Sequence, residues 1–569
     1  MSSRASRIRP FCLRPRHLPG CLLALATIVG CGETRVEPGP IAMRRITADQ
    51  YRQTIADVFD PAIEVTGRFE PDSRHAGLLA VGTAFVSITP AGFEQYDAIA
   101  RRIAEQVLAP DQQARFVPCR PIDPAQPDAK CAGAFLRKYG LRLLRRPLTD
   151  EEIAERSRLA AEATERAGDF HAGLRVALAS LLVAPEFLFR VERASGDPEQ
   201  PDRLRLTDYS LASRLSHFLW NTTPDPELLA AAERGELASD AGLAREVDRL
   251  LASPRLEAGV RAHFADLLGF DALEDVSKDA IVYPRFSRKL LEDAREQTLR
   301  VVADHLVTQK ADYRDLFTTR KSVMTRALGL VYGVRVRARE GFEAMEFASD
   351  SPRAGIQSHV SVLALHAHPG RSSATLRGIF VREALLCQEV PAAPADVDFT
   401  VVQDVANPDL KTARERLEAH RTDAACANCH RLVDPVGLAL EPFDGSGMGR
   451  ETENGAPIDA SGELDGEKFV GPVGLGETLH DSDAAAACAV LGLFRYALGR
   501  EPELGEKAFV RALERRFEEV EYRFPDLMRE IVLSEPFRTT SGPRALEAEK
   551  VAPGAEAAAA RSADSEEAT

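Results

Sequence analysis

The sequence has 569 residues, of which 44% are hydrophobic and 28% are charged, and its formal net charge is −15. This length exceeds what one hydrophobic core usually serves and predicts several domains. The acidic balance disfavours nucleic acid and anionic membrane surfaces as partners. Beyond the N-terminal segment, no stretch is long and apolar enough to cross a bilayer.

Residues 1–30 predict an export signal. Five arginines and no acidic residue precede an apolar run at residues 21–29, which is too short to span a membrane and fits the core of a signal peptide. The run ends in Ile28-Val29-Gly30-Cys31, which resembles a bacterial lipobox. Cleavage before Cys31 would leave this cysteine to carry lipid and tether the chain to a membrane surface. The alternative is a plain secretory signal cleaved nearby. Removal of five arginines would lower the net charge from −15 to −20.

Helical patterns dominate the rest of the chain. Residues 207–220 predict one helix, and Asp225 and Pro226 supply the N-cap and first position of another that ends at Glu233. Residues 241–251 and 287–309 repeat apolar side chains at spacings of three and four, as amphipathic helices do. Alternating strand patterns are sparse. The predicted fold is therefore mainly α, with several small helical domains in series.

Glycine and proline cluster at residues 118–127, 391–394 and 445–476, which predicts loops and boundaries there. Within the last of these, Asp459, Ser461, Glu463 and Asp465 alternate as calcium ligands do. The glycine and the closing glutamate of a calcium loop are missing, so we expect a solvated turn. The tail from residue 543 is rich in Ala and Glu and lacks aromatic residues, which predicts disorder.

The segment Cys426-Ala427-Asn428-Cys429-His430 has the pattern of a c-type haem attachment site. In such sites both thiols form thioethers to the haem vinyl groups, and the adjacent imidazole binds the iron. The sequence therefore predicts one covalent haem c on Cys426 and Cys429, with His430 as the proximal iron ligand. The alternatives are a local disulfide, half of a zinc site, or two free thiols.

Three residues are candidates for the sixth coordination position of the iron, where Met and His are the common ligands. Met448 follows the motif in a glycine-rich segment, and His366 and His368 follow an apolar stretch at residues 360–365. If that segment is extended, the spacing of two puts both imidazoles on one face, although only one of them could bind. For each candidate the alternative is a solvated side chain, and a five-coordinate haem is a further alternative. We expect His420 on the helix that leads into the motif.

Four cysteines remain after the lipid and haem assignments, an even number that suits an oxidising compartment. Cys119 and Cys131 flank a proline-rich loop and are predicted to pair with each other. Cys387 and Cys488 would then form the second bridge. Two free buried thiols are the alternative for this second pair.

Several blocks of the chain resemble a large family of uncharacterised exported proteins from planctomycetes and myxobacteria. These blocks are residues 46–55, 135–149, 209–224, 355–444, 494–500 and 534–538. The fourth block contains the Cys-x-x-Cys-His motif, followed by Asp434-Pro435-Val436-Gly437 and Glu441-Pro442-Phe443-Asp444. This block resembles the planctomycete cytochrome C domain of that family. The resemblance covers nearly the whole chain and implies haem through that domain, but it implies no substrate.

Together these patterns divide the chain into eight segments. They are a lipoprotein signal peptide (1–30), a linker (31–41), an N-terminal helical domain (42–112), a second helical domain (113–192), a third helical domain (203–335), a cytochrome-like domain (352–475), a C-terminal helical domain (476–542) and a disordered tail (543–569).

The predicted function is that of an exported c-type haem lipoprotein, anchored by lipid in the periplasm or at the outer membrane. It would transfer electrons from an extracytoplasmic oxidation, together with an unidentified redox partner protein. The alternative is a non-redox binding or scaffold protein of the cell surface, in which Cys-x-x-Cys-His is a disulfide or a structural metal site.

Overall fold

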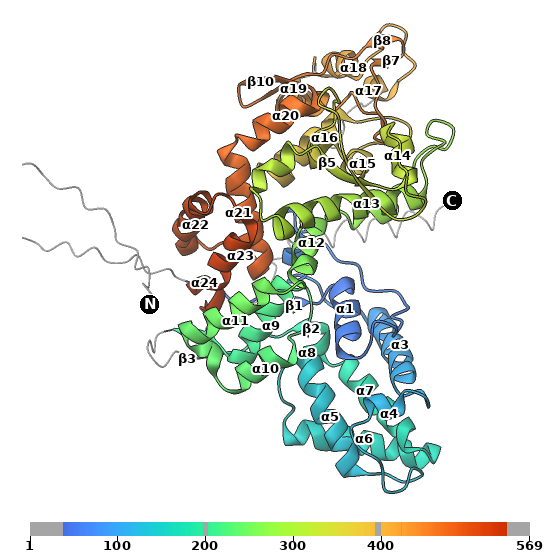
Figure 1. Cartoon of the computed structure of the whole chain (residues 1–569), viewed down its shortest axis with the longest axis vertical. Coiled ribbons are helices and arrows are strands. Elements are labelled where there is room, and N and C mark those ends of the chain that lie inside the picture. The colour runs from blue at the N-terminus through green and yellow to red at the C-terminus, as the bar shows by residue number, and fades with distance from the viewer. Residues whose placement is uncertain (1–37, 197–202, 393–399, 423, 543–569) are drawn as a thin grey trace, which may run out of the picture. The chain divides into compact units, whose positions relative to one another are not determined.

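The computed structural model describes residues 38–196, 203–392, 400–422 and 424–542, all of which belong to one unit of the chain. The predicted signal peptide, the predicted lipidation site Cys31 and the predicted disordered tail lie outside the described residues. The described part is mainly α-helical, as predicted (Figure 1). Across these ranges no helix combines the length and the apolar character that a membrane crossing requires.

The first group of helices packs around an aromatic core. Its elements are β1 (Arg44–Arg45), α1 (Ala48–Val58), α2 (Leu79–Gly82), α3 (Pro90–Val107), α4 (Gln113–Phe116), α5 (Ala129–Leu144), α6 (Asp150–Ala167), α7 (Phe170–Leu182), α8 (Pro185–Leu188) and β2 (Phe189–Arg190). Thr47 and Thr149 begin α1 and α6 with capping boxes, in which the cap hydroxyl accepts a backbone N–H. Helices α5, α6 and α7 contact one another (Figure 1). The chain closes this group by pairing β1 with β2 antiparallel.

The second group contains the four helices predicted from the sequence. Its elements are β3 (Ala194–Gly196), β4 (Leu204–Leu206), α9 (Asp208–Leu219), α10 (Pro226–Glu233), α11 (Asp240–Ala252), α12 (Leu256–Leu267), α13 (Arg288–Ala303), β5 (Lys321–Met324), α14 (Arg326–Tyr332) and β6 (Glu343–Glu346). Asp225 caps α10 by accepting the Leu228 N–H at 2.8 Å, as predicted. A π-helical turn, Asp304–Thr308, follows α13 and completes the predicted segment 287–309.

The third group carries the Cys-x-x-Cys-His motif. Its elements are α15 (Val360–Leu365), α16 (Ala374–Phe380), α17 (Thr400–Gln403), α18 (Ala413–His420), α19 (Ala424–Leu438), β7 (Thr452–Glu453), β8 (Ala456–Pro457), β9 (Ser461–Leu464) and β10 (Glu467–Val470). The apolar stretch at residues 360–365 is helical, His366 ends this helix, and the following Ala367 forms an isolated antiparallel bridge with Ser372.

The prediction of a loop at residues 445–476 is wrong in part, because this segment contains two β-hairpins. Strands β7 and β8 pair across Asn454-Gly455, and β9 and β10 pair across Asp465-Gly466. All four turn residues have positive φ, which two-residue hairpin turns require and which Asn-Gly and Asp-Gly adopt readily. Asn-Gly and Asp-Gly predict hairpin turns, but the prediction of a loop treated the glycines of this segment as loop residues only.

The last group of elements ends in a strand that pairs with β4 of the second group. Its elements are α20 (Gly471–His480), α21 (Asp483–Leu498), α22 (Lys507–Glu519), α23 (Phe524–Val532), α24 (Glu535–Arg538) and β11 (Thr539–Thr540). Strand β11 pairs with β4, so β4 is the central strand of a three-stranded sheet. The structure contains the disulfides Cys119–Cys131 and Cys387–Cys488, which are the predicted pairs.

Candidate haem-attachment site

Helix α19 carries the whole Cys-x-x-Cys-His motif. The spacing of three puts Cys426 and Cys429 on the same side of the helix, one turn apart. Cys426 is buried, Cys429 is partly exposed, and both are free thiols, so the alternative of a local disulfide is not formed. Burial, and then the nearby Asp434 carboxylate, raise the pKa of the Cys429 thiol.

His430 is held by a buried carboxylate one turn further along α19. Its Nδ1 lies 2.9 Å from Oδ2 of Asp434, whose side chain is fully buried. The second carboxylate oxygen, Oδ1, accepts a hydrogen bond of 2.9 Å from the Thr375 hydroxyl on α16. Both acceptors of Asp434 are therefore used, and the imidazole of His430 has a defined orientation.

Two glycines bring α16 and α19 close enough for this contact. A Cβ atom on Gly437 would lie 1.7 Å from the carbonyl oxygen of Ala374, and one on Gly378 would lie 2.0 Å from that of Val433. Side chains at either position would push the helices apart. The helix crossing therefore depends on glycine, and it places Thr375 against Asp434.

The residues of α19 fit a covalent c-type haem. When Nδ1 of His430 donates its hydrogen to Asp434, the lone pair of the neutral ring is on Nε2. Iron-binding histidines commonly use this arrangement, in which a carboxylate fixes the tautomer and strengthens the ligand. Cys426 and Cys429 would hold the porphyrin through thioethers, and His430 Nε2 would ligate the iron.

His420 lies beside His430, a proximity that the sequence analysis missed. The two rings are nearly perpendicular, with centroids 4.9 Å apart. His420 is buried at the last residue of α18, which contacts α19 (Figure 1). The short connection between the two helices was the available signal, because it makes them neighbours in space.

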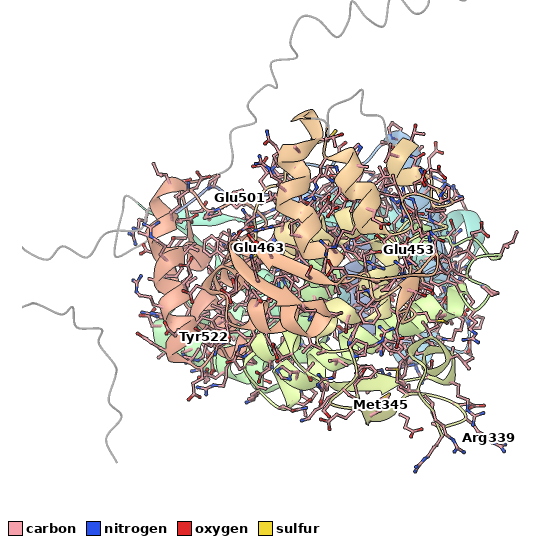
Figure 2. The ribbon with its side chains drawn as sticks, turned by 90° about the horizontal axis from the view of Figure 1, so that it is seen from above. Arg339, Met345, Glu453, Glu463, Glu501 and Tyr522 are labelled. Atoms are coloured by element: carbon pink, nitrogen blue, oxygen red, sulfur yellow. A yellow bond between two sulfur atoms is a disulfide. The ribbon has the colours of Figure 1, made fainter. Side chains whose placement is uncertain are left out.

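The N-terminus of α18 is held by Glu453 from the β7–β8 hairpin, labelled in Figure 2. Its carboxylate accepts the Ala413 N–H at 2.7 Å and pairs with Arg416 at 2.6 Å. Negative charge at a helix N-terminus is stabilising. The hairpin therefore helps to position the helix that carries His420.

His366 and His368 lie after α15, in a different part of the same group. His366 stacks on Phe380 with centroids 4.5 Å apart, and its Nε2 is buried without a hydrogen-bond partner among the described residues. Burial, with the charges of Arg377 and Lys278, lowers the pKa of His366 to about 3. Burial, with Arg371 and Lys278, lowers the pKa of His368 to about 4. Both imidazoles are therefore neutral near pH 7, as a metal ligand must be.

Met448 packs into an apolar cluster that includes Leu328 and Val360. Its backbone N–H donates to the Asp444 carboxylate at 2.9 Å. Asp434, Thr375 and His420 thus lie next to the motif, whereas the Met448 side chain packs in an apolar cluster that contains no residue of the motif. Within the described ranges, no group of three or more His, Cys, Asp or Glu side chains is arranged to hold a metal ion.

Comparison with known protein families finds five matches in series. Each is described as a protein of unknown function: DUF1587 at residues 44–109, DUF1595 at 131–192, DUF1592 at 206–334, DUF1588 at 353–453 and DUF1585 at 465–537. The candidate site lies within the DUF1588 match. No curated protein and no solved structure matches the chain. The chain therefore belongs to the planctomycete cytochrome-associated family in which these five domains of unknown function follow one another.

Proposed function

We propose that this chain carries one covalent haem c and transfers electrons from an extracytoplasmic oxidation. The observation that supports this function best is the hydrogen bond of 2.9 Å between His430 Nδ1 and Asp434, beside two free thiols spaced for haem attachment. The haem would supply reversible one-electron chemistry at the iron. Ligation by His430 and burial by the surrounding helices would set its potential.

The residues of the chain have separate tasks in this function. Cys426 and Cys429 would attach the porphyrin, and His430 would ligate the iron. Asp434 holds the tautomer and orientation of His430, and Thr375 holds Asp434. The sixth position would be taken by His366, His368 or Met448, as predicted, while the His420 ring packs against the ring of His430.

Haem attachment is tested by producing the full-length protein in a host that performs cytochrome c maturation. The denatured protein is expected to keep a haem-sized mass increment and a pyridine haemochrome spectrum. Replacement of both Cys426 and Cys429 by Ala should remove both signals. An unmodified mass from a competent host would reject the function and favour the scaffold alternative.

Proximal ligation is tested by His430→Ala, which should leave haem attached but shift its spectrum toward high spin. Asp434→Asn should keep the ligand yet change the potential, because a neutral amide no longer strengthens the imidazole. His366→Ala, His368→Ala and Met448→Ala form the comparison set for the sixth position, with His420→Ala as their control. A His430→Ala protein with wild-type spectrum and potential would refute this assignment.

We further propose that the chain is exported and anchored at the cell envelope through lipid on Cys31, with a redox protein as its partner. Cys31→Ser should release the protein from the membrane fraction and abolish labelling by fatty acid. A variant that stays in the membrane fraction, from a wild type that takes up no fatty acid, would reject the anchor.

A further inference from the structure

A large cleft lies away from α19 and has no role in the proposed haem site. Its volume is about 1370 Å³, and its walls include residues of β1, α1, α2, β2, α9, α12, α13 and the C-terminal end of α21. None of its lining residues belongs to the DUF1588 match at residues 353–453. We call this space the Arg190 cleft.

An excess of buried positive charge borders the Arg190 cleft. Arg44 and Arg190 are directly opposite partners of the β1–β2 pair, and both are buried. Like charges in this position normally destabilise a strand pair. Arg214 is also buried nearby, and Glu192 is the carboxylate that pairs with both Arg214 and Arg44. The guanidinium groups of Arg214 and Arg44 thus share one internal carboxylate.

Arg190 is the guanidinium with two unmet hydrogen-bond donors. Its Nε and Nη2 are buried and make no hydrogen bond among the described residues. Two acids of the cleft are engaged elsewhere: Asp266 accepts the backbone N–H groups of Leu79 and Ala80, and Asp72 pairs with Arg45. A buried cation with unmet donors is costly, which favours a counter-charge supplied from outside the chain.

The two unmet donors of Arg190 have a definite geometry. Nε–H and Nη2–H point from the same edge of a guanidinium, and this edge binds a planar carboxylate through two parallel hydrogen bonds. Arg214 uses the same two nitrogens on Glu192, with Nε donating to Oε1 at 2.8 Å and Nη2 donating to Oε2. The chain therefore shows, beside Arg190, the interaction that Arg190 lacks.

His217 adds an acceptor to the wall of the same cleft. Its Nδ1 lies 2.8 Å from the Ser213 carbonyl oxygen, to which it donates. Nε2 is then an acceptor, and it is buried without a partner among the described residues. Burial, followed by the charges of Arg190 and Arg145, holds the pKa of His217 well below its usual value. The ring is therefore neutral and can accept a hydroxyl hydrogen.

We propose that the Arg190 cleft binds a small hydroxycarboxylic acid, with its carboxylate on Nε and Nη2 of Arg190 and a hydroxyl group donating to Nε2 of His217. This ligand supplies both groups that the buried residues lack, a planar anion and a hydrogen-bond donor. An anion without a hydroxyl group would satisfy Arg190 alone.

The proposal is tested by isothermal titration calorimetry on the full-length protein at constant ionic strength. The probes are glycolate, malate, gluconate and glucuronate. The comparison probes are acetate, glucose and inorganic phosphate. We expect saturable binding of at least one hydroxy acid, weaker binding of acetate, and none of glucose. Failure of all four hydroxy acids to bind, or binding of phosphate that equals or exceeds theirs, would overturn the proposal.

Variants assign the binding to the named residues. Arg190→Lys keeps the charge but removes the fork, so affinity should fall about tenfold or more. Arg414→Gln removes a charge from α18, which contributes no residue to the cleft, and should leave affinity nearly unchanged. His217→Phe should abolish the preference for hydroxy acids over acetate. Wild-type affinity in a folded Arg190→Lys protein would overturn the assignment to Arg190. If that variant does not fold, the titrations of the wild-type protein with the seven probes decide the proposal.

The haem and the Arg190 cleft are tested independently. The protein with Cys426→Ala and Cys429→Ala should bind the same acid with unchanged affinity, because no residue that lines the cleft belongs to the match at residues 353–453. Loss of acid binding in that protein would contradict the proposed independence of the cleft.

Discussion

Arg377 provides the most direct test of how the cytochrome-like region is held together. Its side chain is fully buried on α16, and it donates to the carbonyl oxygens of Leu440 and Phe443 at 2.8 Å and of Asp444 at 2.6 Å. It also lies 3.4 Å from the Glu441 carboxylate. One guanidinium therefore joins α16 to the segment that follows α19.

Arg377→Met would keep a straight side chain of similar length but remove every donor. Three buried carbonyl groups would lose a charged partner, while Glu441 would keep its pair with Arg450 at 2.6 Å. Removal of one partner from a buried charged network costs about 3–5 kcal/mol. The substitution also removes the cost of burying a cation, and this burial lowers the pKa of Arg377 in the wild type. We therefore expect a loss of about 3 kcal/mol, at the lower end of that range.

The measurement is urea unfolding, combined with amide hydrogen exchange of residues 353–453. Arg414→Met is the matched control, because Arg414 lies on α18 in the same region, is partly exposed and pairs with exposed Asp459. This control should change stability by less than about 1 kcal/mol. Equal midpoints and equal exchange for both variants would refute the structural role assigned to Arg377.

Three further changes test the packing, the crosslinks and the pH response. Gly437→Ala should destabilise the protein by about 1–3 kcal/mol or more by separating α16 from α19, whereas Gly492→Ala on α21, where a Cβ meets no neighbour within 4 Å, should be neutral or stabilising. Loss of Cys387–Cys488, which closes 101 residues, should cost about 4.7 kcal/mol, against about 2.8 kcal/mol for Cys119–Cys131, which closes 12. Burial lowers the pKa of His263 to about 3, so the free energy of unfolding of the wild type should decrease as pH falls from about 6.5 toward 3. His263→Phe should remove the part of this decrease that His263 causes, which is on the order of 3 kcal/mol at about pH 4.

Each of these three expectations has a clear contrary result. Equal thermal midpoints for Gly437→Ala and Gly492→Ala would show that the helix crossing tolerates a methyl group. Equal losses for the two double Cys→Ser variants would reject loop length as the determinant of their effects. Parallel melting curves of wild type and His263→Phe across the acid range would show that His263 does not titrate as its burial implies.

The local features of this protein could be predicted from its sequence. Thr207, Asp225 and Ser287 are N-caps where the sequence predicts helix starts, because capping depends on a side chain and a backbone N–H only two or three residues apart. The Cys-x-x-Cys-His motif is local for the same reason. The hairpin turns at Asn454-Gly455 and Asp465-Gly466 were equally local, and a reading of turn dipeptides would have found them.

Only the tertiary structure decided which distant residues meet. Thr375 contacts Asp434 because glycines let α16 and α19 cross closely, and no spacing within either helix reveals that crossing. Arg190 faces Arg44 because β1 pairs with β2 across the whole first group of helices. Sequence periodicity specifies which face of an element is buried, but long-range packing selects the partner. Both the Thr375 hydroxyl that holds Asp434 and the position of Arg190 opposite Arg44 are products of that selection, whereas Asp434 and His430 are neighbours within one helix.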